Sequence, residues 1–122
     1  MADAAADNLI SEIRTVCDSE RSLAELMREA AARVRVLFGA ERVAISLSGV
    51  QAVSLTAKPG NRPPAFVFSH PIQSNGTVYG RLEVDLHQPA LSPGVMLVTL
   101  RETAQLLALR AERARKVLRK IA

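Results

Sequence analysis

The stretch that decides the fold is residues 65–87, AFVFSHPIQSNGTVYGRLEVDLH, in which two runs rich in apolar residues flank Asn75-Gly76. Asn-Gly between such runs is the strongest short signal for a two-residue β-hairpin turn, because both turn positions need positive φ. We therefore predict antiparallel strands at 65–73 and 77–87.

The second strand of this hairpin is predicted to have two different faces, because successive side chains alternate across a strand. One face carries Val78, Leu82, Val84 and Leu86, and the other carries Tyr79, Arg81, Glu83, Asp85 and His87. Counting back from the turn places Ser74 opposite Thr77 and His70 opposite Arg81. The sheet is thus expected to have a solvated side or a polar pocket side.

An earlier hairpin is predicted around Gly49. Val43, Ile45 and Leu47 alternate with small polar residues, and the apolar pattern resumes in 53–55. Residues 58–64 cannot continue a strand, because three of them are prolines without a backbone donor.

Two amphipathic helical stripes precede the strands, in 9–17 and 22–38. The second begins at Ser22 with Glu25 in capping-box spacing and ends before Gly39. Both stripes keep one heptad register that only Glu20 interrupts. The pattern is therefore consistent with one bent helix or with two helices.

The last predicted helix starts at Ser92-Pro93 and runs to residue 121, roughly 43 Å at 1.5 Å per residue. Its apolar heptad seam comprises Leu97, Leu100, Ala104, Leu107, Ala111, Ala114, Leu118 and Ile121. The seam could cover this chain's own sheet up to about Leu109. The remaining turns must pack elsewhere, so we expect a homodimeric helical bundle that also uses Ile13 and Val16.

These elements predict an α+β fold, with an antiparallel sheet of about four to five strands and the N- and C-terminal helices on one face. We divide the chain into an amphipathic helix (1–21), a domain (22–109) and a basic extension of the last helix (110–122). The run from Phe38 to Ile45 resembles the start of a GAF domain. The stretches His70-Pro71-Ile72 and 75–84, and the closing Leu-rich helix, resemble that family as well.

The GAF resemblance implies a sensory or regulatory module whose first and last helices run antiparallel on one sheet face. GAF domains enclose their ligand with a helical lid between the first hairpin and the Pro-containing strand. Only residues 58–64 occupy that place here, so we expect an open pocket at most. An open face could still bind a nucleotide, haem or another anion through Arg62, His70, Tyr79 and Arg81.

Charge and composition narrow the function further. The net charge is +4, but residues 1–29 hold seven acidic and three basic residues, and 110–122 hold one acidic and six basic residues. An Arg-rich helix can bind nucleic acid. No aromatic residue follows Tyr79 to stack on bases, so we favour charge pairing between the two ends.

No catalytic motif or set of metal ligands is visible, so we expect no enzyme, no cofactor and no metal. The lone Cys17 lies on an apolar stripe and matches no GAF cysteine that attaches a bilin or reduces methionine sulfoxide. The N-terminus resembles no signal peptide, and no apolar run could span a bilayer. We predict a cytoplasmic, bacterial, dimerising regulatory domain that could also meet an effector domain, with ligand sensing and nucleic-acid binding as alternatives.

Overall fold

The computed structural model describes residues 3–56, 66–87 and 92–121. The elements, in chain order, are α1 (Asp3–Asp18), α2 (Leu23–Phe38), β1 (Arg42–Leu47), β2 (Val50–Leu55), β3 (Phe66–Ser74), β4 (Thr77–Leu86) and α3 (Pro93–Ile121). The predicted α+β class is confirmed, with four strands in the sheet.

The sheet is antiparallel throughout, in the order β2-β1-β4-β3. Each hairpin turns on two residues of positive φ, Ser48-Gly49 (50° and 83°) and Asn75-Gly76 (51° and 80°). Two consecutive positive-φ residues form the tight turn whose twist matches that of the flanking strands. Both predicted turns are therefore confirmed.

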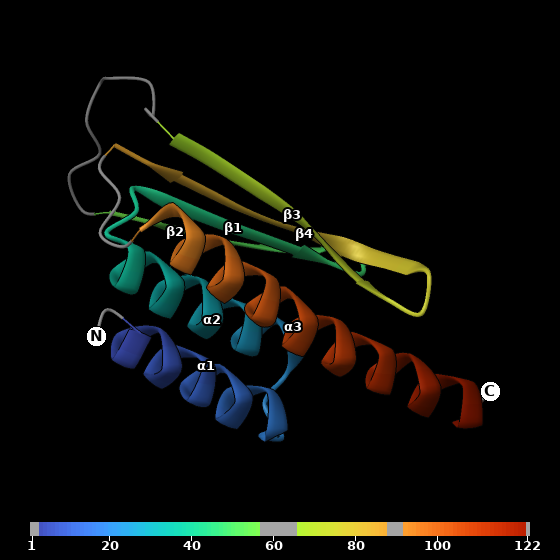
Figure 1. The fold of residues 1–122 in the computed structure, drawn as a ribbon. Helices are drawn as coiled ribbons and strands as arrows, with labels where there is room; N and C mark the ends of the chain where they lie inside the picture. The colour runs from blue at the N-terminus through green and yellow to red at the C-terminus, as the bar shows by residue number, and fades with distance from the viewer. Residues whose placement is uncertain (1–2, 57–65, 88–91, 122) are drawn as a thin grey trace.

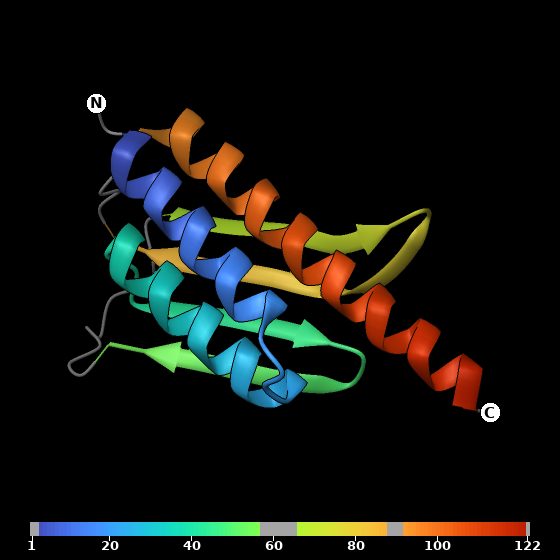
Figure 2. The ribbon, with the colours of Figure 1, turned by 90° about the horizontal axis from the view of Figure 1, so that it is seen from below.

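All three helices lie on one face of the sheet: α2 and α3 form the layer next to the strands, and α1 lies on the other side of that layer (Figures 1 and 2). The helix α2 packs on β1 and β2, α3 packs on β3 and β4, and α1 packs on α2 and α3. The core between the layers includes Ile13, Phe38, Ile45, Leu82 and Leu107, each at most 1% exposed. No element in the described ranges covers the opposite side of the sheet, which we call the outer face.

The helix ends follow the local signals in the sequence. The Ser22 hydroxyl accepts from the backbone N–H of Glu25 at 3.2 Å, and Gly39 ends α2 at φ 63°. Ser92 caps α3 in the same way, by accepting from Val95 N–H at 3.3 Å. Between α1 and α2 the chain reverses over residues 19–22. Of the two alternatives that the heptad register left open, the structure thus has two helices and not one bent helix.

The predicted antiparallel arrangement of the first and last helices is wrong, because α1 and α3 run in the same direction (Figure 2). The beginning of α1 at Asp7 and Ile10 lines a groove with Gly94 and Val98, and its end at Cys17 meets Arg113. Four antiparallel strands return the chain to the end of the sheet where β1 begins. Because α1 also begins at that end, α3 starts beside it.

A β-bulge interrupts the second hairpin close to its turn. Ile72 pairs with Gly80 and Gln73 with Val78, so Tyr79 is an extra residue on β4. Leu82 is buried as predicted, whereas Val78 is 62% exposed. The prediction that Val78 lies on the same face as Leu82, Val84 and Leu86 is wrong, because the extra residue reverses the alternation of side chains at the bulge.

Candidate functional site

The structure does not bring the predicted ligand residues together. Ser74 does lie opposite Thr77, but the bulge shifts His70 by one residue, so that it pairs with Leu82 and not with Arg81. Directly opposed residues in an antiparallel pair share a face. His70 therefore belongs to the helix side of the sheet and Arg81 to the outer face, which corrects the predicted site.

Tyr79 does not complete that site either. Tyr79 packs against the hydrophobic core as a half-buried side chain, and its backbone carbonyl accepts from Ser48 N–H at 2.9 Å. Arg62 lies outside the described residues. Arg81 donates to the hydroxyl of Ser69 on the same face.

The strand register defines the outer face as three rows of side chains across the sheet. The rows are Leu55-Arg42-Asp85-Val67, Val53-Ala44-Glu83-Ser69 and Gln51-Ser46-Arg81-Pro71. Arg42 lies 3.4 Å from Asp85 and 3.5 Å from Glu83, so its positive charge is paired with carboxylates at the centre of the outer face. Apolar side chains at both margins surround this charged centre, and Val67 is 63% exposed.

The outer face offers hydrogen-bonding groups and apolar contact area but no metal site. No group of three or more potential metal ligands occurs within the described ranges. His87 and Glu41, 2.9 Å apart, form an isolated pair next to the ends of β4 and β1. An anion that bound at Arg42 would have to displace Glu83 or Asp85, whereas Arg81 on the same face is exposed and donates to the hydroxyl of Ser69.

The predicted dimer seam is mostly occupied within the chain itself. Leu100, Ala104, Leu107, Ala111, Ile13 and Val16 are buried at 5% exposure or less. They fill the space between α1, α3 and the sheet, because α3 packs on both. Of the other seam residues, Leu97 is 39% exposed and Ala114 is half-buried, whereas the side chain of Leu118 is not described.

The exposed side of α3 carries apolar residues that the heptad pattern did not single out. Val98 is 53% exposed and Leu109 is 48% exposed, and Arg101 and Gln105 lie exposed between them. These four residues, which we call the α3 strip, recur at steps of three and four and so share one face. They span the twelve residues 98–109, about three helical turns, and this spacing is the sequence signal that could have revealed the strip.

A groove of about 620 Å³ runs between the beginnings of α1 and α3, beside the α3 strip. The half-buried side chains of Ile10 and Val95 line this groove, and so does the exposed side chain of Val98. Apolar surface therefore continues from α3 across to α1.

The two basic residues of 110–122 whose side chains are described donate to backbone carbonyls. Arg113 donates to Cys17 O at 2.8 Å, and Arg110 to Arg21 O at 3.4 Å. The last carbonyls of a helix lack intrahelical partners and carry partial negative charge, so Arg113 stabilises the end of α1, whereas Arg110 holds the connection between α1 and α2. Two of the six basic residues of 110–122 are thus engaged within the fold.

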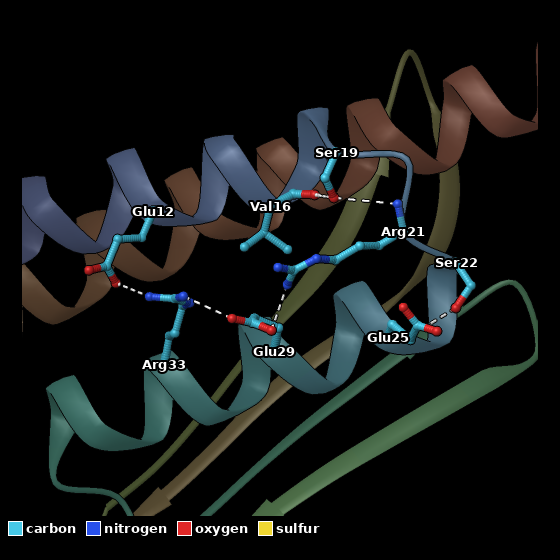
Figure 3. Close-up of polar contacts among 8 residues, drawn as sticks. All are labelled: Glu12, Val16, Ser19, Arg21, Ser22, Glu25, Glu29 and Arg33. Carbon is cyan, nitrogen blue, oxygen red and sulfur yellow. Dashed lines mark hydrogen bonds and ion pairs between the residues drawn. The ribbon is translucent and has the colours of Figure 1, made fainter.

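The acidic residues of α1 and α2 pair with arginines of the same hairpin of helices (Figure 3). Arg33 bridges Glu12 at 2.6 Å and Glu29 at 2.8 Å, and Arg21 also reaches Glu29 at 2.6 Å. The hydrogen bond from Arg33 lowers the pKa of Glu29. These ion pairs lie across the α1–α2 contact. The predicted pairing of the acidic start with the basic end stays a prediction, because the side chains from residue 115 onward are not described.

Comparison with solved structures decides the fold family. The GAF domain from Acinetobacter phosphoenolpyruvate-protein phosphotransferase matches with a TM-score of 0.73 over 90% of this chain and 94% of that chain, at 13% identity. The chain has the GAF fold. The phycoerythrobilin-bound GAF domain from a cyanobacterial phytochrome matches with a TM-score of 0.59 over 90% of this chain and 93% of that chain, also at 13% identity.

One solved structure similar to this GAF fold is an enzyme. It is the free methionine-R-sulfoxide reductase from Neisseria meningitidis, in complex with its substrate, with a TM-score of 0.73, 16% identity, and coverage of 92% of this chain and 91% of that chain. Such identities establish the fold alone. A scan of the sequence against protein-family models finds no match, and neither does a search of the curated proteins.

The one thiol of this GAF-fold chain is poorly suited to catalysis. Cys17 is 5% exposed in α1, on the helix side of the sheet. Burial raises its pKa to about 11, so the thiolate that would act as a nucleophile is scarce at neutral pH.

None of the helices in the described ranges is long and apolar enough to cross a membrane.

Proposed function

We propose that this chain is a cytoplasmic regulatory module of the GAF fold, which acts by helix–helix contact with a second copy of itself. The observation that carries the proposal is the α3 strip, on which the exposed side chains of Val98 and Leu109 are covered by no described element of the chain. An effector domain that presents a helix could use the same surface.

The buried areas favour a weak, reversible contact. Fully burying an exposed Val or Leu side chain contributes about 1.5–3 kcal/mol, and Val98 and Leu109 each still expose about half of theirs. Two copies related by a two-fold axis double that contribution, and the groove between α1 and α3 adds Ile10 and Val95. Association also costs at least about 4 kcal/mol in lost freedom, which leaves a net of a few kcal/mol, so we expect dissociation in the high-micromolar to millimolar range.

The end of α3 gives such a contact a route to other domains. Glu112 accepts hydrogen bonds at 2.9 Å from Ser74 and from Asn75 at the tip of the β3–β4 hairpin, where the sheet ends. The nine residues that follow continue as helix past this tip (Figure 1). We propose that pairing of two α3 helices sets the distance between the domains or partner proteins that contact the ends of these helices.

Light scattering coupled to size-exclusion chromatography tests this proposal. The double variant Val98→Glu/Leu109→Glu should be monomeric at concentrations where the wild type dimerises, because each dimer would bury four carboxylates. Val36→Glu is the matched control, since Val36 is 70% exposed on α2 and lies outside the α3 strip. A wild type that stays monomeric even at about 2 mM, above most of the expected range of dissociation constants, would refute the proposal, and so would equal dissociation of the control variant.

A second candidate function is ligand sensing on the outer face. It is favoured by the mixed apolar and charged rows around Arg42, which no described element covers. A thermal-shift screen with nucleotides, haem and inorganic phosphate at millimolar concentration tests it, with Arg42→Ala and Arg81→Ala as variants. A shift that survives both substitutions, or the absence of any shift, would exclude the outer face as the site.

A further inference from the structure

The two edges of the sheet differ in their capacity to accept another strand. The phase of the hydrogen-bond ladder follows from two contacts at 2.9 Å, Ser48 N–H to Tyr79 O and Thr56 N–H to Glu41 O. Even-numbered residues of β1 thus bond to β4, and odd-numbered ones to β2. Because this alternation continues through each antiparallel pair, the register identifies which backbone groups point outward at each edge.

The β3 edge is blocked. Val67, Ser69 and Pro71 lie opposite the β4 residues that bond to β1, so their backbone groups point away from the sheet. Pro71 has no N–H to offer, and its carbonyl already accepts from Nδ1 of His70 at 2.8 Å. Proline at an outward-facing edge position is a common protection against pairing with another chain.

The β2 edge has no such protection. The outward-pointing groups belong to Gln51, Val53 and Leu55, because their neighbours in the strand pair with odd-numbered residues of β1. These three residues offer six backbone hydrogen-bonding groups, and the strand Val50–Leu55 contains neither proline nor charge. In the described part of the chain no other strand pairs with this edge.

Arg35 of α2 flanks this edge on the helix side, and Arg28 lies on the same face of that helix. Arg35 Nε donates to the hydroxyl of Ser54 at 3.0 Å, and no carboxylate in the described ranges pairs with it. Arg28 lies two turns earlier on the same face of α2 and is exposed. Since α2 and β2 run in the same direction (Figure 2), seven helical residues, about 10.5 Å, bring Arg28 to the level of Gln51.

We propose that the β2 edge binds an extended segment of a partner protein in which apolar and acidic residues alternate. Its backbone would pair with Gln51, Val53 and Leu55, adding a fifth strand to the sheet. Its apolar side chains would lie on the outer face beside Val53 and Leu55, which are 46% and 57% exposed. Its acidic side chains would lie on the helix side, within reach of Arg35 and Arg28.

Charge decides between this partner and a second copy of the chain. Pairing two β2 strands about Val53 would place the two Ser54 residues on a diagonal, about 7–8 Å apart, and with them the two Arg35 side chains. Like charges at that distance oppose pairing, whereas alternating carboxylates favour it. This surface is also separate from the α3 strip, so the two proposals fail independently.

Amide hydrogen exchange with blocked synthetic peptides tests the proposal on the full chain. The peptide TVEVEVT at millimolar concentration should slow exchange at Gln51, Val53 and Leu55 at least tenfold, with no change at Val67 and Ser69. The peptide TVKVKVT has the same apolar face with inverted charge and should bind at least tenfold more weakly. Protection at the β3 edge, equal binding of both peptides, or no protection would overturn the proposal.

Two variants of the protein complete the test. Val53→Pro removes an outward-facing donor and no bond to β1, so it should abolish peptide binding in a folded chain. Arg35→Glu should invert the preference toward TVKVKVT, which remains measurable if the proline variant fails to fold. A dimer in the wild type that Val53→Pro dissociates would assign the edge to a second copy and overturn the proposal.

Discussion

Replacing Gly80 by alanine should destabilise this fold far more than one added methyl group ordinarily does. Gly80 follows the bulge at Tyr79, where β4 lies against β1. A Cβ atom there would stand 1.7 Å from the backbone oxygen of Ser46 and 2.6 Å from its carbonyl carbon. Since such contacts do not occur below about 3 Å, the two central strands would have to separate by more than 1 Å.

The magnitude follows from this separation. Overpacking in a core costs about 1–3 kcal/mol and occasionally more, and the obstacle here is backbone that cannot change rotamer. Weakening the adjacent bond from Ser48 N–H to Tyr79 O adds about 1 kcal/mol. We expect the free energy of unfolding to fall by about 3–4 kcal/mol, a large part of the 5–15 kcal/mol typical of a domain.

Gly94→Ala is the matched control for this experiment. Gly94 lies in the first turn of α3, and no atom lies within 4 Å of the position its Cβ would take. Alanine is the better helix former by up to about 1 kcal/mol, so this variant should be as stable as the wild type or more stable. Urea unfolding followed by circular dichroism at 222 nm measures both variants.

Opposite signs for the two alanines are the decisive result. The reasoning is refuted if Gly80→Ala stays within about 0.5 kcal/mol of the wild type, since that is the ordinary range for surface substitutions. A fall in stability of the same size for Gly94→Ala would refute it as well, because the close approach of Ser46 would then not be the cause.

Three further predictions concern the core, the thiol and the ion pairs. Leu107→Ala should cost about 2–5 kcal/mol of unfolding free energy in urea, because Leu107 is fully buried, and Leu109→Ala well under 1 kcal/mol; equal losses would contradict the burial of the seam. With a pKa of about 11, Cys17 should have roughly one thiolate in a thousand molecules at pH 8 and react with a thiol reagent far more slowly than in urea; equal rates would refute its burial. Because folding lowers the pKa of Glu29, its contribution to stability is complete above the ordinary value of 4.5 and declines as the pH falls through and below it. Glu29→Gln should therefore flatten the acid side of the stability curve, and an unchanged slope would exclude a role for the bridge to Arg33.

Local signals in the sequence predicted the elements well because each depends on neighbouring residues. Ser22 and Ser92 cap helices wherever a helix follows, and Asn75-Gly76 turns the chain at the lowest strain. The order of helices and hairpins likewise predicted the α+β class, and the GAF fold was accessible through the resemblance of residues 38–45 and 70–84 to that family. The residues of the site were not accessible, because the bulge at Tyr79 depends on how β4 meets β1 and β3 together.

The sequence by itself determined the elements, their order, both turns and a long last helix with apolar residues on one seam. Only the tertiary structure decided what that seam contacts, because a heptad pattern describes a helix face and not its partner. The face of α3 that packs on α1 and on the sheet buries Leu107, and the opposite face leaves Val98 and Leu109 exposed. The packing of Gly80 against Ser46 likewise joins residues far apart in sequence, and the bulge beside it sends His70 and Arg81 to opposite faces.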